Sequence, residues 1–277
     1  MKNEENNDFL SGFNSEVSRR SFFKKCGAIS IGAITANYLS PFELYSQTTN
    51  KISTISVVKG KSIDKIVEKA INAVGGIKKY VKRGDVVMIK PNAVYANPFK
   101  LATTTNPYVI RKIIKMCYDA GAAKVRVTDR PSNSVPIPQY GKVNGLEAVC
   151  KQTGAEFVFP KKSRFKKMNL KLNGENWPVY ADIVEADKLI NVPIAKDHMM
   201  AYVTLGMKNF FGAVGGQRYA LHFNIHENIA KMAKFFNPTL TIIDAVRILE
   251  KNGPMGGSLK FVKKMDDSGF ILFEFMI

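Results

Sequence analysis

The sequence predicts an α/β domain with a mainly parallel sheet, helices on both faces of that sheet, and an inserted basic hairpin. Short apolar runs of strand length alternate along the chain with longer segments whose apolar residues recur at helical spacing. This alternation is typical of βαβ units, in which helices cover both faces of parallel strands. Because 277 residues of 45% hydrophobic composition can bury one sizeable core, we expect residues 51–277 to form a single domain.

The first half of that domain alternates strand and helix twice. We expect a strand at Ile52–Val58 and an amphipathic helix at Ser62–Val81, where apolar residues lie three and four positions apart. The uninterrupted apolar run Val86–Ile89 predicts a strand that is buried on both faces. A second helix begins at Asn106-Pro107, because Asn caps helices and Pro suits their first turn, and it ends at Gly121.

The second half continues in the same order. A strand at Lys124–Thr128 leads to a helix at Gly145–Thr153, which Gly154 ends, and then to a strand at Glu156–Phe159. Two further apolar runs, Lys188–Val192 and Leu240–Ile243, predict two more strands of the sheet.

A basic segment interrupts this pattern at Lys161–Leu172. Its residues alternate in polarity, and the turn-forming pair Asn173-Gly174 follows it, so we expect a β-hairpin. Six of its residues are lysine or arginine. Charged residues on an exposed strand discourage sheets from associating, and we therefore expect this hairpin to be a solvated edge.

The first 50 residues contain a sharp targeting signal. Ser18–Lys24 reads SRRSFFK, which matches the twin-arginine pattern S-R-R-x-F-L-K except at one position, and the uncharged run Cys26–Pro41 follows it. That run is too short and too mildly apolar to span a bilayer comfortably, so residues 1–50 are expected to be a signal peptide and linker. The alternative is a chance arginine pair before a buried helix. The expected partner is the twin-arginine translocase, and the expected location is the periplasm or cell envelope.

Charge and cysteine content narrow the classes of partner. The 41 Lys and Arg residues against 23 Asp and Glu residues give a formal net charge of +18, which favours anionic partners, although a lysine-rich soluble surface would have the same composition. The spacing of the three cysteines predicts neither a disulfide scaffold nor a metal site. Cys117 and Cys150 fall on the apolar sides of predicted helices, where we expect both to be core residues.

Polar residues follow four of the predicted strands. Lys90-Pro91-Asn92 follows the first, Asp129 the second, Pro193–His198 the third and Asp244 the fourth. Loops that leave the carboxyl ends of parallel strands converge at one edge of a sheet. We therefore expect these side chains to line one common cleft.

The segment from Lys196 to Gly216 holds the densest chemistry. We expect His198, Lys196 and Asp129 to be catalytic, with His198 transferring a proton or binding a metal and Asp129 or Asp244 orienting it. Lysines and glycine-permitted backbone can hold a phosphate or carboxylate. The expected substrate-binding residues are Lys90, Asn92, Thr104, Thr105, Lys208, Asn209 and Gly212. No Walker or G-x-G-x-x-G nucleotide pattern is present, and no nucleophile elbow of a serine hydrolase.

All three histidines lie between residues 198 and 226. His222 and His226 are four positions apart, which on a helix would place both on one face. Such a pair could bind Zn, Ni or Fe if a third ligand is added, and His198, Asp129 or Asp244 could supply it. The alternative is a surface pair on an amphipathic helix.

An ordered set of segments resembles the domain-of-unknown-function 362 family. The segments are VMIKPN from Val87, ATTTNP from Ala102, AGAAKV from Ala120, LINVPIAKDH from Leu189, TLGMKNFFG from Thr204, PTLTIID from Pro238 and NGPMGG from Asn252. The resemblance covers roughly residues 52 to 260. It implies an α/β domain with a Lys-x-His loop and a Lys-Asn-x-x-Gly loop in a family whose members are often exported, and it implies no established reaction.

Two features depart from that family. Some members carry ferredoxin-like modules, whereas this chain has no C-x-x-C-x-x-C-x-x-x-C run and is expected to bind no iron–sulphur cluster of its own. The family domain also continues beyond the Gly-Pro-x-Gly-Gly segment, whereas here the sequence from Phe261 leads to an apolar tail at Phe270–Ile277. We therefore expect a domain that is truncated at its C-terminus and lacks an edge element.

These observations leave functions from different classes open. The first is an exported enzyme, or a cofactor-associated protein with a redox partner, that acts on a small anionic substrate with or without a divalent metal. The second is a non-catalytic protein that binds an anionic polymer through the basic hairpin. Nucleic acid is disfavoured as that polymer because no helix-turn-helix, zinc-finger or aromatic-rich signature is present. The third is an inactive, truncated relic.

Overall fold

The computed structural model describes residues 54–132, 137–172 and 175–273. The chain divides between residues 50 and 51 into two units, and every described residue belongs to the second. The twin-arginine motif, the run Cys26–Pro41, the pair Asn173-Gly174 and the last four residues lie outside the described residues. Within the described ranges, no helix combines the length and the apolar character that crossing a membrane requires.

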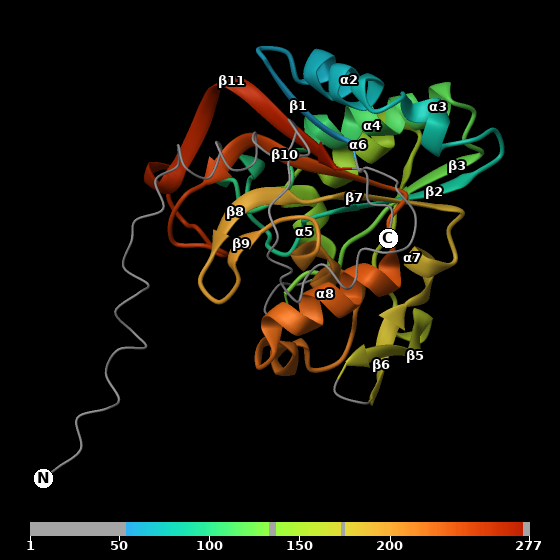
Figure 1. The fold of residues 1–277 in the computed structure, drawn as a ribbon, viewed down its shortest axis with the longest axis vertical. Helices are drawn as coiled ribbons and strands as arrows, with labels where there is room; N and C mark the ends of the chain where they lie inside the picture. Colours follow the sequence, from blue (N-terminus) through green and yellow to red (C-terminus); the bar gives the residue numbers. More distant parts are fainter. Residues whose placement is uncertain (1–53, 133–136, 173–174, 274–277) are drawn as a thin grey trace, which may run out of the picture. The chain divides into compact units, whose positions relative to one another are not determined.

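A nine-stranded mixed sheet forms the centre of the domain (Figure 1). Five parallel strands run across it in the order β10 (Leu240–Leu249), β7 (Lys188–Val192), β2 (Val86–Pro91), β3 (Lys124–Val127) and β4 (Glu156–Phe157). The predicted α/β class and mainly parallel sheet are confirmed. The central strands β2 and β7 are short apolar runs that are buried on both faces, as is typical of parallel strands covered by helices.

The C-terminal strand is antiparallel to its neighbours. β11 (Val262–Phe273) lies between β10 and β1 (Ile55–Gly60) and pairs antiparallel with both. β11 includes most of the tail that begins at Phe261. The sequence of this tail did not predict a long strand of the sheet.

The chain continues from β7 into another strand rather than into the predicted loop. After Pro193, β8 (Ile194–His198) pairs parallel with β10, and β9 (Tyr202–Thr204) folds back antiparallel against β8. Residues 194, 196 and 198 are buried while 195 and 197 are half-buried. The period of two was not recognised because two of the three buried residues, Lys196 and His198, are basic.

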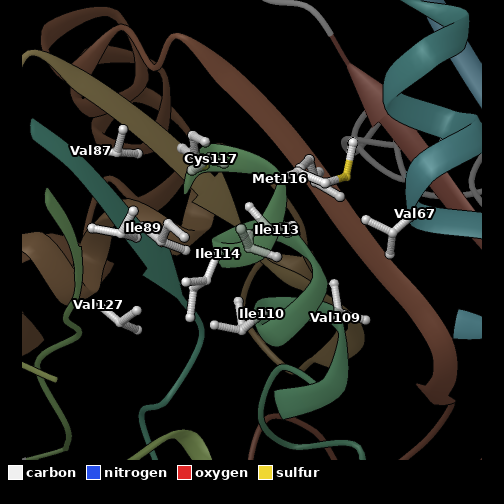
Figure 2. Close-up of a cluster of buried hydrophobic side chains, with 14 of the residues drawn as sticks. Val67, Val87, Ile89, Val109, Ile110, Ile113, Ile114, Met116, Cys117 and Val127 are labelled. Atoms are coloured by element: carbon white, nitrogen blue, oxygen red, sulfur yellow. The ribbon is translucent and has the colours of Figure 1, made fainter. Parts of the chain in front are cut away.

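Three helices cover one face of the sheet: α2 (Ile63–Ala73), α4 (Pro107–Asp119) and α6 (Leu146–Thr153). Side chains of α4 such as Ile110 and Ile114 pack with Val87 and Ile89 of β2 (Figure 2). Asn106 caps α4 by accepting a hydrogen bond from the backbone N–H of Tyr108, as the sequence predicted. Cys117 and Cys150 are buried in this core as free thiols.

The helix predicted at Ser62–Val81 is divided into two helices. Gly75 and Gly76 adopt φ angles of 108° and 78°, which only glycine adopts without strain, and they separate α2 from the single turn α3 (Ile77–Tyr80). The remaining helical segments are short: η3 (Phe99–Leu101), α5 (Ile137–Val143), η4 (Lys162–Arg164), α7 (Ala181–Val184), η5 (Lys208–Ala213), η6 (Arg218–His222) and η7 (Leu259–Phe261).

The opposite face is covered by α8 (Ile225–Phe236) and by the hairpin of β5 (Phe165–Leu172) and β6 (Glu175–Tyr180) (Figure 1). Alternation along a strand explains the two cores, because Met88 points into this second core while its neighbours Val87 and Ile89 point into the first. The predicted basic hairpin is present, but it is not an edge of the main sheet. It forms a separate two-stranded sheet whose apolar side, including Leu170 and Val179, is buried in the second core.

Candidate functional site

A cavity of about 490 Å³ opens beside the carboxyl ends of β2, β3 and β8. Polar and basic side chains line it together with apolar ones such as Val94, Tyr95 and Phe211, and four further apolar side chains are exposed at its margin. The polar and basic lining residues include Asn92, Asp129, Lys196, His198, Lys208, Asn209, Arg218 and His222. The exposed apolar residues at the margin are Met199, Met200, Tyr219 and Met255. Segments that are up to 163 residues apart, from Asn92 to Met255, meet here, as the order of polar strand ends predicted for most of the polar ones.

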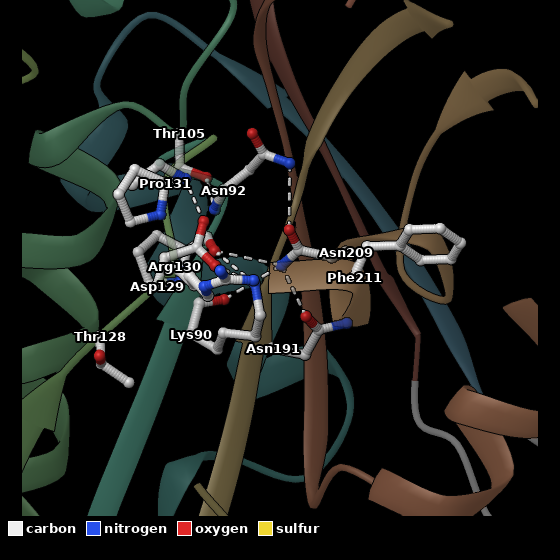
Figure 3. Close-up of polar contacts among 12 residues, drawn as sticks. Lys90, Asn92, Thr105, Thr128, Asp129, Arg130, Pro131, Asn191, Asn209 and Phe211 are labelled. Carbon is white, nitrogen blue, oxygen red and sulfur yellow. Dashed lines mark hydrogen bonds and ion pairs between the residues drawn. The ribbon is translucent and has the colours of Figure 1, made fainter. Parts of the chain in front are cut away.

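A buried ion pair forms one wall. The Nζ of Lys90 lies 2.7 Å from Oδ1 of Asp129, and Oδ2 of Asp129 accepts the backbone N–H of Ala93 at 2.6 Å (Figure 3). Lys90 is fully buried, and this burial lowers the pKa of its amine, while Asp129 opposes the shift. Both carboxylate oxygens are thus occupied within the protein, and Asp129 serves as the counter-charge of Lys90.

Gly212 lines the cavity and leaves room for that ion pair. A Cβ at residue 212 would lie 1.9 Å from Oδ1 of Asp129 and 2.9 Å from Nζ of Lys90. Heavy atoms never approach so closely, so a side chain at this position would displace the pair. The lack of a side chain at Gly212 thus makes room for Asp129, and the substrate-binding role of Gly212 stays a prediction.

Asn209 lies at the centre of an amide network. Its Nδ2 donates to Oδ1 of Asn191 at 2.8 Å and to the carbonyls of Lys90 and Pro91, and its Oδ1 accepts from Nδ2 of Asn92 at 3.1 Å (Figure 3). Oδ1 of Asn92 in turn accepts from Lys196. Because these amide atoms are used within the protein, Asn92 and Asn209 position the cavity wall.

The two predicted threonines lie behind the cavity and do not line it. Oγ1 of Thr105 accepts the backbone N–H of Asn92 and donates to the carbonyl of Val192, so it ties β2 to β7. Thr104 is fully buried, and its Oγ1 has no hydrogen-bond partner among the described residues. The structure thus places neither hydroxyl where it meets a ligand in this cavity.

Lys196 presents an amine without an acidic partner. Its Nζ donates to the carbonyl of Thr103 at 2.7 Å, to Oδ1 of Asn92 at 3.3 Å and to the carbonyl of Pro254 at 3.3 Å, all neutral acceptors. Burial lowers the pKa of Lys196 to about 7, because desolvation penalises the ammonium form. This amine therefore changes charge near neutral pH.

Lys208 and Arg218 complete a set of three cationic groups. Nζ of Lys208 lies 3.4 Å from the centroid of the Phe211 ring, and burial lowers the pKa of Lys208 to about 7, with the Arg218 and Lys90 charges acting in the same direction. Arg218 donates to the carbonyls of Arg130, Pro131 and Phe211, and burial lowers its pKa to about 10. Sequence reasoning missed Arg218. Its one signal was its position two residues after Gly215-Gly216, at the end of the densest polar segment.

His198 and His222 stack with a centroid separation of 6.2 Å and an interplanar angle of 17°. Nδ1 of His198 accepts the backbone N–H groups of Met200 and Ala201, so the proton of the neutral ring is on Nε2. Nδ1 of His222 instead faces the carbonyls of Arg218 and Tyr219, so it carries the proton and leaves Nε2 as an acceptor. Burial lowers the pKa of His198 to about 4 and also lowers that of His222. One imidazole is therefore a hydrogen-bond donor to the cavity and the other an acceptor.

The four predicted metal ligands are not brought together. Asp244 is fully buried, its oxygens accept the backbone N–H groups of Asn106 and Val246, and burial raises its pKa to about 6. His226 is exposed and stacks on Tyr202. In the part of the chain that the structure describes, no three His, Cys, Asp or Glu side chains are grouped so that they could hold a metal ion.

The expectation that His222 and His226 share a helix face is wrong. His222 ends η6, whereas His226 lies in the first turn of α8, and Asn224 stands between the two helices with a non-helical backbone. Four-residue spacing places side chains on one face only where the helix is continuous.

The family model of a domain of unknown function, DUF362, matches residues 87–272, which is more than half of the chain and contains the whole cavity lining. The chain belongs to the DUF362 family. This confirms the resemblance that the ordered sequence segments indicated.

Other proteins resemble this DUF362 chain over part of their length. A thylakoid-associated protein of Synechocystis sp. is 28% identical over 195 residues, which cover 68% of this chain and 60% of the relative. The lactate racemase apoprotein of Thermoanaerobacterium thermosaccharolyticum superposes with a TM-score of 0.44 at 15% identity, over 78% of this chain and 53% of that one. A protein of Thermotoga maritima gives a TM-score of 0.44 at 9% identity, over 69% and 52%. The chain spans about three-fifths of the curated relative and about half of each solved structure.

Proposed function

We propose that this DUF362 chain is an enzyme that binds a small anionic molecule in the cavity and acts on it by proton transfer. The observation that carries the proposal is a charge imbalance. Lys196, Lys208 and Arg218 all line the cavity, whereas Asp129, its one lining carboxylate among the described residues, is already paired with Lys90.

Unpaired buried cations are costly, and an anionic ligand removes that cost. Burial lowers the pKa of Lys196 and Lys208 to about 7, because desolvation penalises the ammonium form and the charge of Asp129 offsets this penalty only in part at Lys196. A bound carboxylate or phosphate supplies the missing charge, raises both pKa values and accepts charge-assisted hydrogen bonds. Nζ of Lys208 lies over the face of the Phe211 ring, which leaves its N–H donors available to such a ligand.

The paired histidines supply the proton chemistry. Nε2 of His222 has a free lone pair and is the proton acceptor in this proposal, while Nε2–H of His198 donates a hydrogen bond to the oxygen where negative charge develops. In this proposal His222 transfers the proton, whereas the sequence had predicted that role for His198. His198 is unsuited to accept one, because two backbone N–H groups already occupy its Nδ1.

Calorimetric titration with acetate, malonate and inorganic phosphate at pH 6.5 and low ionic strength tests anion binding. We expect binding of at least one of these anions, and a loss of tenfold or more in affinity for Lys208→Met and for Arg218→Met. Lys69→Met is the matched control, since it removes the same charge from an exposed position on α2. Equal weakening by the control, or no binding of any of the three anions, would contradict the proposal.

Export by the twin-arginine route is a separate proposal that rests on Ser18–Lys24. We expect the full chain to reach the periplasm of a bacterial host, and the variant with Arg19→Lys and Arg20→Lys to remain in the cytoplasm. Cell fractionation measures this. A periplasmic double variant would show that the arginine pair is not a targeting signal.

The basic hairpin gives weaker support to binding of an anionic polymer. Arg164 forms ion pairs with Asp182 and Glu185, and Lys166 forms one with Glu185, so these two hairpin cations already have acidic partners. A polymer bound there would compete with these pairs.

A further inference from the structure

The mouth of the cavity is apolar although its interior is cationic. Met199, Met200, Tyr219 and Met255, which we call the apolar rim, all line the cavity, and their side chains are 81%, 44%, 71% and 63% exposed. Met199 and Met200 lie in the turn between β8 and β9, Tyr219 lies in η6, and Met255 follows β10. Three separate segments therefore place exposed apolar groups around one opening.

Ring contacts and hydrogen bonds hold these three segments together. Tyr202 of β9 stacks on His226 at the start of α8, and His198 of β8 stacks on His222 of η6, against which the ring of Tyr219 lies tilted. The loop that carries Met255 is fixed to β8, because the N–H of Gly253 donates to Oδ2 of Asp197 and Nζ of Lys196 donates to the carbonyl of Pro254. Figure 1 shows β8 and β9 near α8, in agreement with the contact between Tyr202 and His226. The rim is thus a continuous feature and not a set of scattered side chains.

Such a rim is unexpected for a site that takes only a small, fully hydrated anion. Exposed apolar patches in soluble proteins mark places where something apolar binds. Methionine is flexible and polarizable, and it adapts to apolar groups of different shape. The volume of about 490 Å³ also falls within the range of about 300–1,000 Å³ of sites for ligands larger than a single carboxylate or phosphate group.

We propose that the ligand of this cavity is an amphiphilic anion, whose carboxylate or phosphate head meets Lys196, Lys208 and Arg218 and whose alkyl or aryl part lies against the apolar rim. This inference rests on the proposed function and adds the class of ligand to it. The ligand is a single molecule, because the cationic interior and the rim line the same cavity.

Two homologous series of anions test the proposal: n-alkyl carboxylates from acetate to octanoate, and alkyl phosphates from methyl to hexyl phosphate. Affinity is measured by calorimetry at concentrations where each compound is monomeric. In at least one series we expect the affinity to rise about two- to fourfold for each added methylene, as burial of alkyl groups predicts. Lys208→Met is expected to weaken the longest and the shortest member by the same factor, since it removes a contact with the head only.

Rim variants separate the contribution of the tail. We expect the variant with Met199→Gln and Met255→Gln to bind the longest member at least tenfold more weakly and the shortest member within twofold of the unmodified protein. Leu259→Gln is the control, because Leu259 is 61% exposed and does not line the cavity. These exposed substitutions keep side-chain size, and an unchanged melting temperature confirms that the variants fold.

The outcomes distinguish this inference from the proposed function. If short and long anions bind equally well, the proposal of an amphiphilic ligand is wrong, while the proposed anion site is still supported. If no member of either series binds, the proposed function fails as well. If the rim variants leave every affinity unchanged but prevent sedimentation of the protein with phosphatidylglycerol vesicles, the rim docks on a membrane surface and the proposal is overturned.

Discussion

The stacked rings of His198 and His222 are held in opposite tautomers. Backbone N–H groups point at Nδ1 of His198, and backbone carbonyls point at Nδ1 of His222. The backbone therefore fixes one ring as a donor and the other as an acceptor before any ligand binds. In such an arrangement the direction of proton movement is set by the fold.

Nitrogen NMR of the imidazole rings checks this assignment. We expect His198 to carry its proton on Nε2 and His222 on Nδ1, with His198→Asn and His222→Asn variants used to assign the signals. Burial lowers the pKa of His198 to about 4, and the Lys208 charge adds to that effect, so His198 should stay neutral down to about pH 5 and its pKa should rise in Lys208→Met. Two rings in the same tautomer would contradict the assignment.

The stability of the empty protein should depend on pH through Lys208. Its pKa in the folded protein, about 7, lies below the ordinary value of 10.5, so between these values the unfolded chain binds more protons and the free energy of unfolding rises with pH. The slope is at most about 1.4 kcal/mol per pH unit for such a lysine. The charged groups that act on Lys208 are Arg218 and Lys90, and His198 and His222 are nearby.

Urea denaturation from pH 6 to pH 9 measures the effect. Lys208→Met should be more stable than the unmodified protein at pH 6, and this difference should shrink as the pH rises. Lys69→Met, an exposed charge on α2, should show no such trend. A difference for Lys208→Met that does not change with pH would mean that its ammonium is not desolvated.

Gly212→Ala should be strongly destabilising. The new Cβ would overlap Oδ1 of Asp129 and crowd Nζ of Lys90, so the ion pair must move, at an expected cost of about 3–5 kcal/mol. Gly154→Ala is the comparison, because nothing lies within 4 Å of its Cβ and only its φ of 74° is unfavourable, which costs about 1–2 kcal/mol. Equal losses in chemical denaturation would show that contact with Asp129 is not the cause.

Lys90 and Asp129 should be strongly coupled. Lys90→Met leaves a buried carboxylate without its counter-charge and should cost about 3–5 kcal/mol of stability, and Asp129→Asn leaves a buried amine in the same way. The double variant should lose much less than the sum of the two. Additive losses in a double-mutant cycle would mean that the pair does not interact as its 2.7 Å separation indicates.

The two core thiols should be unreactive in the folded protein. Burial raises the pKa of Cys117 and of Cys150 to about 12, with Glu147 adding to the shift at Cys150, so almost no thiolate is present at pH 8. In a Cys26→Ser variant, a thiol reagent should label neither residue until denaturant is added and should then label both. Rapid labelling of the native variant would show that one of these helices opens readily.

The fold could be read from sequence where apolar patterns dominate. Val86–Ile89 and Lys188–Val192 are buried on both faces, so their hydrophobic runs alone indicate central strands. β8 was missed because Lys196 and His198 occupy the positions that an apolar residue occupies in an ordinary strand. The polar side chains that β8 contributes to the cavity therefore conceal the apolar alternation by which a strand is usually predicted.

The sequence predicted which part of the sheet forms the site, but it did not predict the contacts that the individual side chains make there. The rule that strand ends converge brought Asp129, Lys196 and His198 to one place, because it depends only on the sheet order. It could not show that Asp244 turns toward backbone N–H groups, or that Arg218 returns to the cavity from a 3₁₀ segment. Those placements depend on loop geometry, which has no periodic signature.

The position of β11 in the sheet determines when the sheet can close during synthesis of the chain. β1 is the first described strand of the sheet and β11 the last, yet β1 pairs only with β11 among the described strands, and β11 separates it from β10. While the ribosome is still synthesising the chain, β1 has no partner, and the edge of β10 stays open until residues 262–273 emerge. Closure of the sheet must therefore follow translation of this last segment, so nascent chains that stall before it expose two unpaired strand edges.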